Sequence, residues 1–80
     1  MKILWDEPKR LANLDKHGMD FAALDERFFA EARIGPARDG RWTAIGRLNG
    51  VVTVVFVTLG TEALSIISMR PASRRERSIL

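Results

Sequence analysis

The sequence of 80 residues contains no cysteine and a single histidine, His17. The absence of cysteine excludes disulfides and thiolate metal sites, and one histidine is too few for an ordinary zinc site, so we expect neither a metal nor another cofactor. No apolar run approaches the ~20 residues that span a bilayer, and the acidic residues Asp6 and Glu7 near the first residue are unlike a secretion signal. These absences favour a cytoplasmic protein that makes no membrane contact.

Positive charge is concentrated near the end of the chain. The formal net charge is +3, and residues 69–77 alone carry four arginines against one glutamate, so the rest of the chain is neutral overall. Guanidinium groups are planar, permanently charged forks that match the oxygens of phosphate groups. The C-terminal segment therefore indicates a phosphate-rich partner.

The pattern of apolar and turn-forming residues predicts one α+β domain over residues 1–80, in which two helices pack on an antiparallel sheet. Leu11 and Leu14 form the expected apolar stripe of the first helix, and Phe21, Leu24 and Phe28 that of the second. The predicted elements are a strand over 2–5, a helix from Asp6-Glu7-Pro8 to His17, a helix from Asp20, a loop over 33–40, strands over 41–48, 51–58 and 63–69, and a short helix from Ser73.

Several local signals support these boundaries. Gly18 is a typical left-handed helix stop, and Asn49-Gly50 is a strong hairpin signal because both residues tolerate positive φ. The valine-rich segment 51–58 favours a central strand covered on both faces. Ser73 and Glu76 have the spacing of a capping box, in which each residue binds the backbone N–H of the other.

Candidate chemistry lies in two places. Arg70 leaves the end of a strand, and Arg74 and Arg77 share one face of the helix beyond it, an arrangement that can clamp an RNA backbone. His17 closes the first helix next to Lys16, and histidine can transfer protons near neutral pH. The alternatives are a solvated tail in which the glutamate pairs with neighbouring arginines, and a histidine favoured only by the helix dipole.

The two tryptophans, Trp5 and Trp42, can stack on bases, but packing in or beside the core explains them equally well. Asp6 and Glu7 can act as a base, although helix capping accounts for them without further assumption.

An ordered set of short motifs resembles the BrnT family over nearly the whole chain. The motifs are Trp5-Asp6, Lys9, Asn13, Lys16-His17-Gly18 and Phe21; then Arg41-Trp42 and Ile45-Gly46; then Ile66-Ile67-Ser68-Met69-Arg70 and Ala72-Ser73-Arg74-Arg75-Glu76-Arg77.

The resemblance implies a fold like that of the RelE and ParE toxins and a place in a type II toxin–antitoxin pair. It implies a metal-independent endoribonuclease that blocks translation, and a DNA-binding antitoxin of ribbon-helix-helix type whose complex with the toxin binds operator DNA. The RNA 2′-hydroxyl would attack the adjacent phosphate. The implied catalytic residues are His17, Arg70, Arg74 and Glu76, and the implied substrate-binding residues are Lys16, Arg75 and Arg77.

Two departures from the family pattern leave alternatives open. Pro71 stands where a second basic residue often follows Arg70, and no tyrosine follows Arg77. A catalytically weak or inactive module that holds a partner protein or operator DNA through its arginines is the second hypothesis, and a structural protein that meets an acidic partner is the third. For the antitoxin contact, the apolar candidates are Phe28, Phe29, Ile79 and Leu80. For cleavage, we expect His17 and the arginines to share one pocket.

Overall fold

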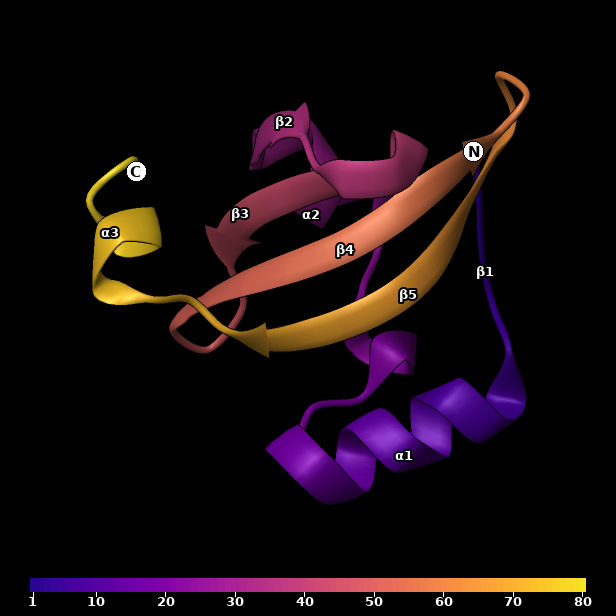
Figure 1. The fold of residues 1–80 in the computed structure, drawn as a ribbon, viewed down its shortest axis with the longest axis horizontal. Helices are drawn as coiled ribbons and strands as arrows, with labels where there is room; N and C mark the ends of the chain where they lie inside the picture. The colour runs from indigo at the N-terminus through magenta and orange to yellow at the C-terminus, as the bar shows by residue number, and fades with distance from the viewer.

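The computed structural model describes residues 1–80 as a five-stranded sheet with three α-helices (Figure 1). The strand order across the sheet is β1-β5-β4-β3-β2. None of the helices is both long and apolar enough to cross a bilayer. The elements are β1 (Lys2–Trp5), α1 (Glu7–His17), the one-turn 3₁₀ helix η1 (Phe21–Ala23), α2 (Glu26–Glu31), β2 (Arg33–Pro36), a second 3₁₀ turn η2 (Arg38–Gly40), β3 (Trp42–Arg47), β4 (Val51–Leu59), β5 (Ala63–Pro71) and α3 (Arg74–Arg77).

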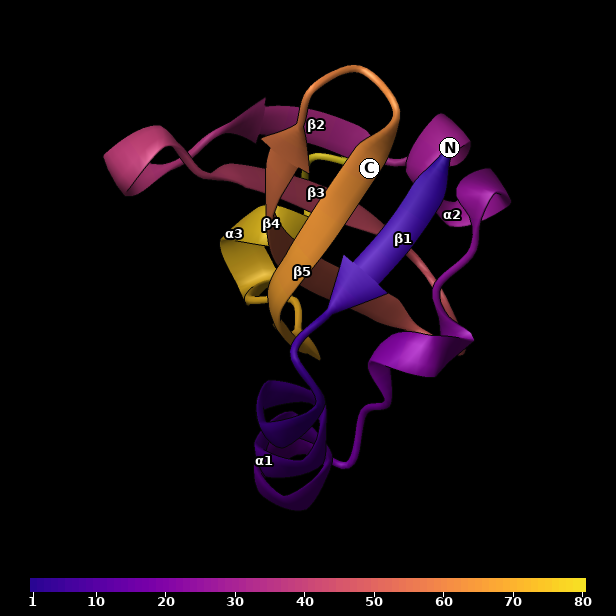
Figure 2. The ribbon, with the colours of Figure 1, turned by 90° about the vertical axis from the view of Figure 1, so that its right-hand side faces the viewer.

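The predicted α+β class is confirmed, but the sheet is mixed rather than antiparallel. β1 pairs with β5 in parallel, with Lys2 opposite Ala63 and Trp5 opposite Ile66. Figure 2 shows β1 beside β5, with both strands running in the same direction. A short apolar segment carries no information about the direction in which it will pair, so this strand was predictable and its orientation was not.

Residues 33–36 form the edge strand β2, and the prediction of a loop over 33–40 is wrong for them. They pair with β3, with Arg33 opposite Ile45 and Pro36 opposite Trp42. Gly35 and Pro36 indicated a loop because proline cannot donate to a sheet ladder. On an edge strand that missing N–H costs nothing, which is why proline is tolerated there.

The second helix begins at Glu26, six residues later than predicted. The Asp20 side chain accepts a hydrogen bond from the Ala22 N–H at 2.9 Å and so caps only the single turn η1. Asp25 then accepts from the Phe28 N–H at 2.8 Å and starts α2. Two aspartates at this spacing start two short helices, because each side chain competes locally for backbone donors.

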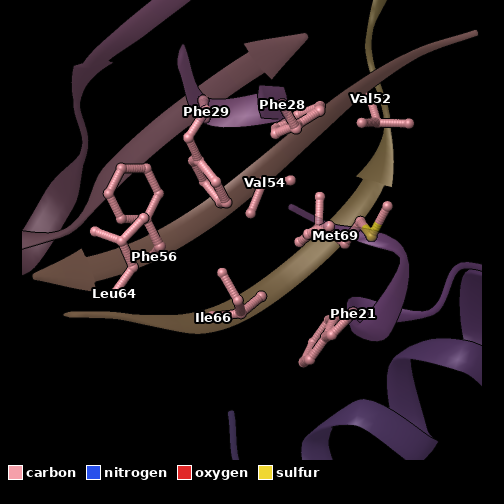
Figure 3. Close-up of a cluster of buried hydrophobic side chains, with 11 residues drawn as sticks. Phe21, Phe28, Phe29, Val52, Val54, Phe56, Leu64, Ile66 and Met69 are labelled. Carbon is pink, nitrogen blue, oxygen red and sulfur yellow. The ribbon is translucent and has the colours of Figure 1, made fainter. Parts of the chain in front are cut away.

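The core lies between one face of the sheet and the segment formed by η1 and α2 (Figure 3). Phe21 and Val54 are fully buried, and Phe29 makes edge-to-face ring contacts with Phe28 at 5.2 Å and with Phe56 at 5.4 Å between centroids. Phe28 and Phe29 are therefore part of the core, and their proposed place in an antitoxin contact is wrong. Ile79 remains exposed and Leu80 partly exposed.

The predicted apolar stripe of the first helix is also wrong. Leu11 and Leu14 are 52% and 37% exposed, and the only buried residue of α1 is the polar Asn13. The helix is thus attached to the sheet by a hydrogen bond from the Met69 N–H to the Asn13 side chain rather than by a stripe of leucines.

Candidate functional site

The C-terminal segment is held in place by the predicted capping box. The Glu76 N–H donates to Ser73 Oγ at 3.1 Å, and the Ser73 N–H donates to Glu76 Oε1 at 2.9 Å. A helix of four residues does not form by propensity alone, so these two bonds supply much of the local order.

Arg70 and Glu76 form a two-pronged ion pair. Arg70 Nη1 lies 2.7 Å from Glu76 Oε1, and Arg70 Nη2 lies 3.0 Å from Glu76 Oε2. The pKa of Glu76 is lowered to about 2, chiefly by the hydrogen bonds from the Arg70 guanidinium; the Ser73 N–H and the nearby Thr53 hydroxyl also lower it, and burial opposes them. The Thr53 hydroxyl nevertheless lies outside hydrogen-bonding geometry with any group.

This ion pair has two chemical consequences. A carboxylate with a pKa of about 2 is ionised at neutral pH and is a poor proton carrier, so Glu76 is suited to positioning Arg70 rather than to acid–base catalysis. Arg70 keeps donors for another anion, since its Nε–H has no partner in the chain and its side chain is 39% exposed.

Because the folded-state pKa of Glu76 is depressed, the pair stabilises the fold above pH 4.5 and this stabilisation is lost as the pH falls toward 2. The full shift corresponds to ~3 kcal/mol, but solvent screens a pair whose arginine is 39% exposed, so we expect a contribution of about 1–2 kcal/mol. Glu76→Gln should lower the free energy of unfolding by that amount at neutral pH, and the difference from the parent should shrink between pH 4.5 and 2.

Urea unfolding at a series of pH values measures the free energy of unfolding and so tests this prediction. Glu31→Gln is the matched control, because the Arg27–Glu31 pair is 82% and 68% exposed and should contribute at most ~0.5 kcal/mol. Equal effects of the two substitutions at neutral pH would contradict the assignment of Arg70–Glu76 as a stabilising pair.

The ion pair lies on the face of the sheet that is turned away from the core, which we call the outer face. Strand register places one row of residues across this face. Arg33 on β2 is opposite Ile45 on β3, Ile45 is opposite Thr53 on β4, and Thr53 is opposite Arg70 on β5. Directly opposed residues point to the same side of a sheet, so the row has an arginine at each end.

The C-terminal segment covers the middle of this row. Glu76 lies beside the buried Thr53, and Ile79 lines a depression of about 240 Å³ together with Arg33, Thr43 and other residues of β2 and β3. The segment thus runs over the outer face from β5 to β2. We name the arginines along this path the arginine band: Arg33, Arg70, Arg74, Arg75 and Arg77.

Four of the five arginines in the band form no ion pair within the chain; only Arg70 does. The hypothesis of a salt-bridged tail therefore holds for Arg70 and Glu76 alone. Arg33 was not among the predicted site residues, because only the pairing of β2 with β3 brings it beside the C-terminal segment.

Asn13 attaches α1 to the edge of β5. Its Oδ1 accepts a hydrogen bond from the Met69 N–H at 3.0 Å, and its Nδ2 donates to the Met19 carbonyl at 3.1 Å. β1 pairs with β5 only as far as Ile66, so Asn13 provides the edge of β5 with a partner where β1 has ended. Asn13 was recognised as part of a motif, but its structural role was not predicted.

Lys16 and His17 lie at the C-terminal end of α1, where Gly18 adopts the left-handed conformation predicted for it, with φ 66°. They line a depression of about 270 Å³ against Ile67 and Ser68 of β5. No arginine of the band lines that depression. Figures 1 and 2 show α1 and α3 on opposite sides of the C-terminal end of β5.

The structure therefore joins Arg70 to Glu76, and it places His17 in a depression shared with Ser68, the residue two positions before Arg70 on β5. It does not form one enclosed pocket that holds His17 together with Arg74, Arg75 and Arg77. A substrate bound at the end of β5 would have to bridge the two groups.

The tryptophans lie away from the arginine band. Trp5 packs against the core cluster and donates from Nε1 to Glu7 Oε1 at 3.2 Å. Trp42 lines an apolar depression of about 440 Å³ with Phe29 and Phe56, on the core side of the sheet. No group of three or more His, Cys, Asp or Glu side chains is arranged to hold a metal ion.

Comparison with known proteins defines the class. The family model described as "Ribonuclease toxin, BrnT, of type II toxin-antitoxin system" matches residues 5–76. The chain belongs to this family of toxins. The crystal structure of the Brucella abortus ribonuclease toxin BrnT is 51% identical in sequence, has a TM-score of 0.87, and matches over 92% of this chain and 99% of that one. No curated protein matches the chain.

Proposed function

We propose that this chain cleaves RNA without a resident metal ion, blocks translation in the cytoplasm, and is neutralised by an antitoxin of ribbon-helix-helix type. The observation that carries this proposal is the arginine band: four of its five guanidinium groups form no ion pair within the chain, Arg33 and Arg70 end one row on the outer face, and the other three arginines stand on α3 beside that face. Such an array suits a polyanion, and family membership makes that polyanion RNA.

We assign the reaction to intramolecular attack of the RNA 2′-hydroxyl on the adjacent phosphorus. The P–O2′ bond forms and the P–O5′ bond breaks, which leaves a 2′,3′-cyclic phosphate and a 5′-hydroxyl. Arg70 and Arg74 bind the phosphate oxygens and stabilise the charge that builds up on them. This chemistry is like that expected of a RelE-type toxin.

Protons move in this reaction at two atoms, the attacking O2′ and the leaving O5′. His17 is the proposed proton-transfer group, supported by its place beside the end of β5. Glu76, which the family resemblance implies is catalytic, is instead assigned to holding Arg70, because a carboxylate with a pKa of about 2 is too weak a base to take a proton at neutral pH. Lys16, Arg75 and Arg77 bind neighbouring phosphates.

An antitoxin that covers the outer face would inhibit the toxin by occupying the arginine band. It would also stabilise the toxin, since a ligand that binds only the folded state raises the free energy of unfolding. Operator DNA would then be bound through the antitoxin of the complex.

The test uses the purified chain, a mixed-sequence RNA pool and a metal chelator. We expect cleavage to persist in the chelator and to give 2′,3′-cyclic phosphate and 5′-hydroxyl ends, while the same pool with 2′-deoxy sugars stays intact. Ends that carry a 5′-phosphate would contradict attack by the 2′-hydroxyl, and loss of cleavage in the chelator would contradict metal independence.

A binding module without cleavage is the second candidate, and one observation favours it: His17 does not share a depression with any arginine of the band. Four phosphate contacts would give a log–log salt slope of roughly −3 on single-stranded nucleic acid and near −4 on duplex. Such slopes without cleaved RNA would support the module. Competition by an acidic peptide but not by nucleic acid would instead support a structural role.

A further inference from the structure

We propose that Arg33 and the depression beside it bind the RNA substrate at a second position, at least one nucleotide away from the phosphate held by Arg70. This inference rests on the proposed ribonuclease function and adds to it a subsite on the opposite side of the C-terminal segment. Arg33 stands on β2, and the depression is lined by residues of β2 and β3 together with Ile79; β2 and β3 lie at the far side of the sheet from β5.

Arg33 and Arg70 are well separated on the outer face. Arg33 and Arg70 end the same row of residues, three inter-strand steps apart. At a strand spacing of ~4.8 Å the row is roughly 14 Å long, and Glu76 of the C-terminal segment, which holds the Arg70 guanidinium, lies over its middle beside Thr53. Two arginines so placed would bind two phosphates of one chain.

The guanidinium group of Arg33 is free to bind a ligand. Its side chain is exposed and forms neither an ion pair nor a hydrogen bond within the chain. An unpaired guanidinium keeps all five donors for a ligand. Arg70, in contrast, is already committed to Glu76 through two of its donors.

The depression beside Arg33 has the size and the lining to hold a base. The depression of about 240 Å³ has Ile45 and Ile79 as apolar walls and Thr43 at its side. This volume is below the ~300 Å³ at which pockets for drug-sized ligands begin, so it suits one flat ring rather than a larger group. An apolar wall next to a guanidinium matches a nucleotide, in which a base adjoins a phosphate.

An acidic segment of a protein partner would also meet the charge of Arg33. A run of acidic side chains would leave the apolar depression beside Arg33 unfilled. Single-stranded RNA, in contrast, offers a base next to every phosphate. We therefore assign the subsite to RNA and treat a protein ligand as an outcome of the test.

The experiment compares Arg33→Ala with Arg27→Ala on two substrates. Arg27→Ala is the matched control, because it removes the same charge from an exposed position on α2, the helix that packs on the core side of the sheet. The substrates are a mixed-sequence dinucleotide pool, which has one internucleotide phosphate and can occupy only one arginine, and a mixed-sequence pool of longer single-stranded RNA.

On the longer RNA we expect Arg33→Ala to raise KM roughly tenfold with kcat close to that of the parent, since the lost contact binds ground state and transition state alike. On dinucleotides the parent and Arg33→Ala should be equal. With an uncleavable 2′-O-methyl version of the longer pool, the salt slope of Arg33→Ala should be smaller by ~0.7.

The outcomes separate the two proposals. If the parent cleaves both pools and Arg33→Ala behaves like Arg27→Ala on both, the subsite is wrong and the ribonuclease function stands. If the parent cleaves nothing, the ribonuclease function is wrong, and the subsite falls with it. A loss of antitoxin binding in Arg33→Ala, with RNA cleavage unchanged, would reassign the position to the protein partner.

Discussion

Arg70→Ala should lower the rate of RNA cleavage by about 10²–10³-fold and relieve the growth arrest that we expect when the toxin is expressed alone. The size of the effect is that of removing one fixed donor that stabilises charge in a transition state. Arg70 is the arginine of the band best fixed in place, because it stands on β5 and Glu76 holds its guanidinium through two hydrogen bonds. Cleavage of the mixed-sequence RNA pool and growth after induction measure the two effects.

The same substitution also leaves the Glu76 carboxylate without its partner, so stability needs its own control. Glu76→Gln weakens the ion pair but keeps the guanidinium, and thermal unfolding should show a loss of stability comparable to that of Arg70→Ala. We expect Glu76→Gln to reduce cleavage by tenfold at most. Equal losses of activity in the two variants would mean that Arg70 acts through the fold, and an undiminished arrest in Arg70→Ala would remove Arg70 from the mechanism.

The features that the sequence predicted correctly depend on residues close together in the chain. The capping box of Ser73 and Glu76, the left-handed Gly18 and the positive φ angles of Asn49 and Gly50 all formed as expected. Each depends on the conformational preference or hydrogen-bonding reach of one side chain, which hardly changes with the rest of the fold.

The features that were missed depend on pairings between distant segments. The parallel direction of β1, the strand β2 and the row that ends in Arg33 all follow from strand register, which no local pattern encodes. Asn13 is the clearest case, because its main partner, the Met69 N–H, is 56 residues away in the sequence.

The relation of His17 to the arginines was missed for the same reason. The order of motifs along the chain correctly indicated two groups of basic residues, but their distance in space depends on where α1 lies relative to β5. The structure brings His17 to Ser68 on the edge of the strand, while the C-terminal segment turns onto the outer face. Two groups on either side of a strand end can act on one extended substrate, and this arrangement is consistent with the RNA polymer that we propose as the substrate.

Asn13→Ala should lower the free energy of unfolding by about 2–5 kcal/mol, a large part of the ~4–12 kcal/mol expected for a domain of this size. Alanine would leave the buried Met69 N–H and the half-buried Met19 carbonyl without their partners, and an unpaired group costs ~1–3 kcal/mol when buried, with the carbonyl toward the low end of that range. Since Asn13 is the only buried residue of α1, its loss should also free the end of the helix that carries His17. Cleavage should therefore fall even at temperatures where the variant remains folded.

Urea unfolding and hydrogen exchange at the Met69 amide measure the effect of this substitution. Leu14→Ala is the matched control on the same helix, because Leu14 is 37% exposed and its truncation should cost less than ~1 kcal/mol. Asn13→Asp keeps an acceptor for the Met69 N–H and loses only the donor to Met19, so it should fall between the parent and Asn13→Ala. If Asn13→Ala were no less stable than Leu14→Ala, water would be satisfying both backbone groups, and α1 would be held to β5 by something other than this amide.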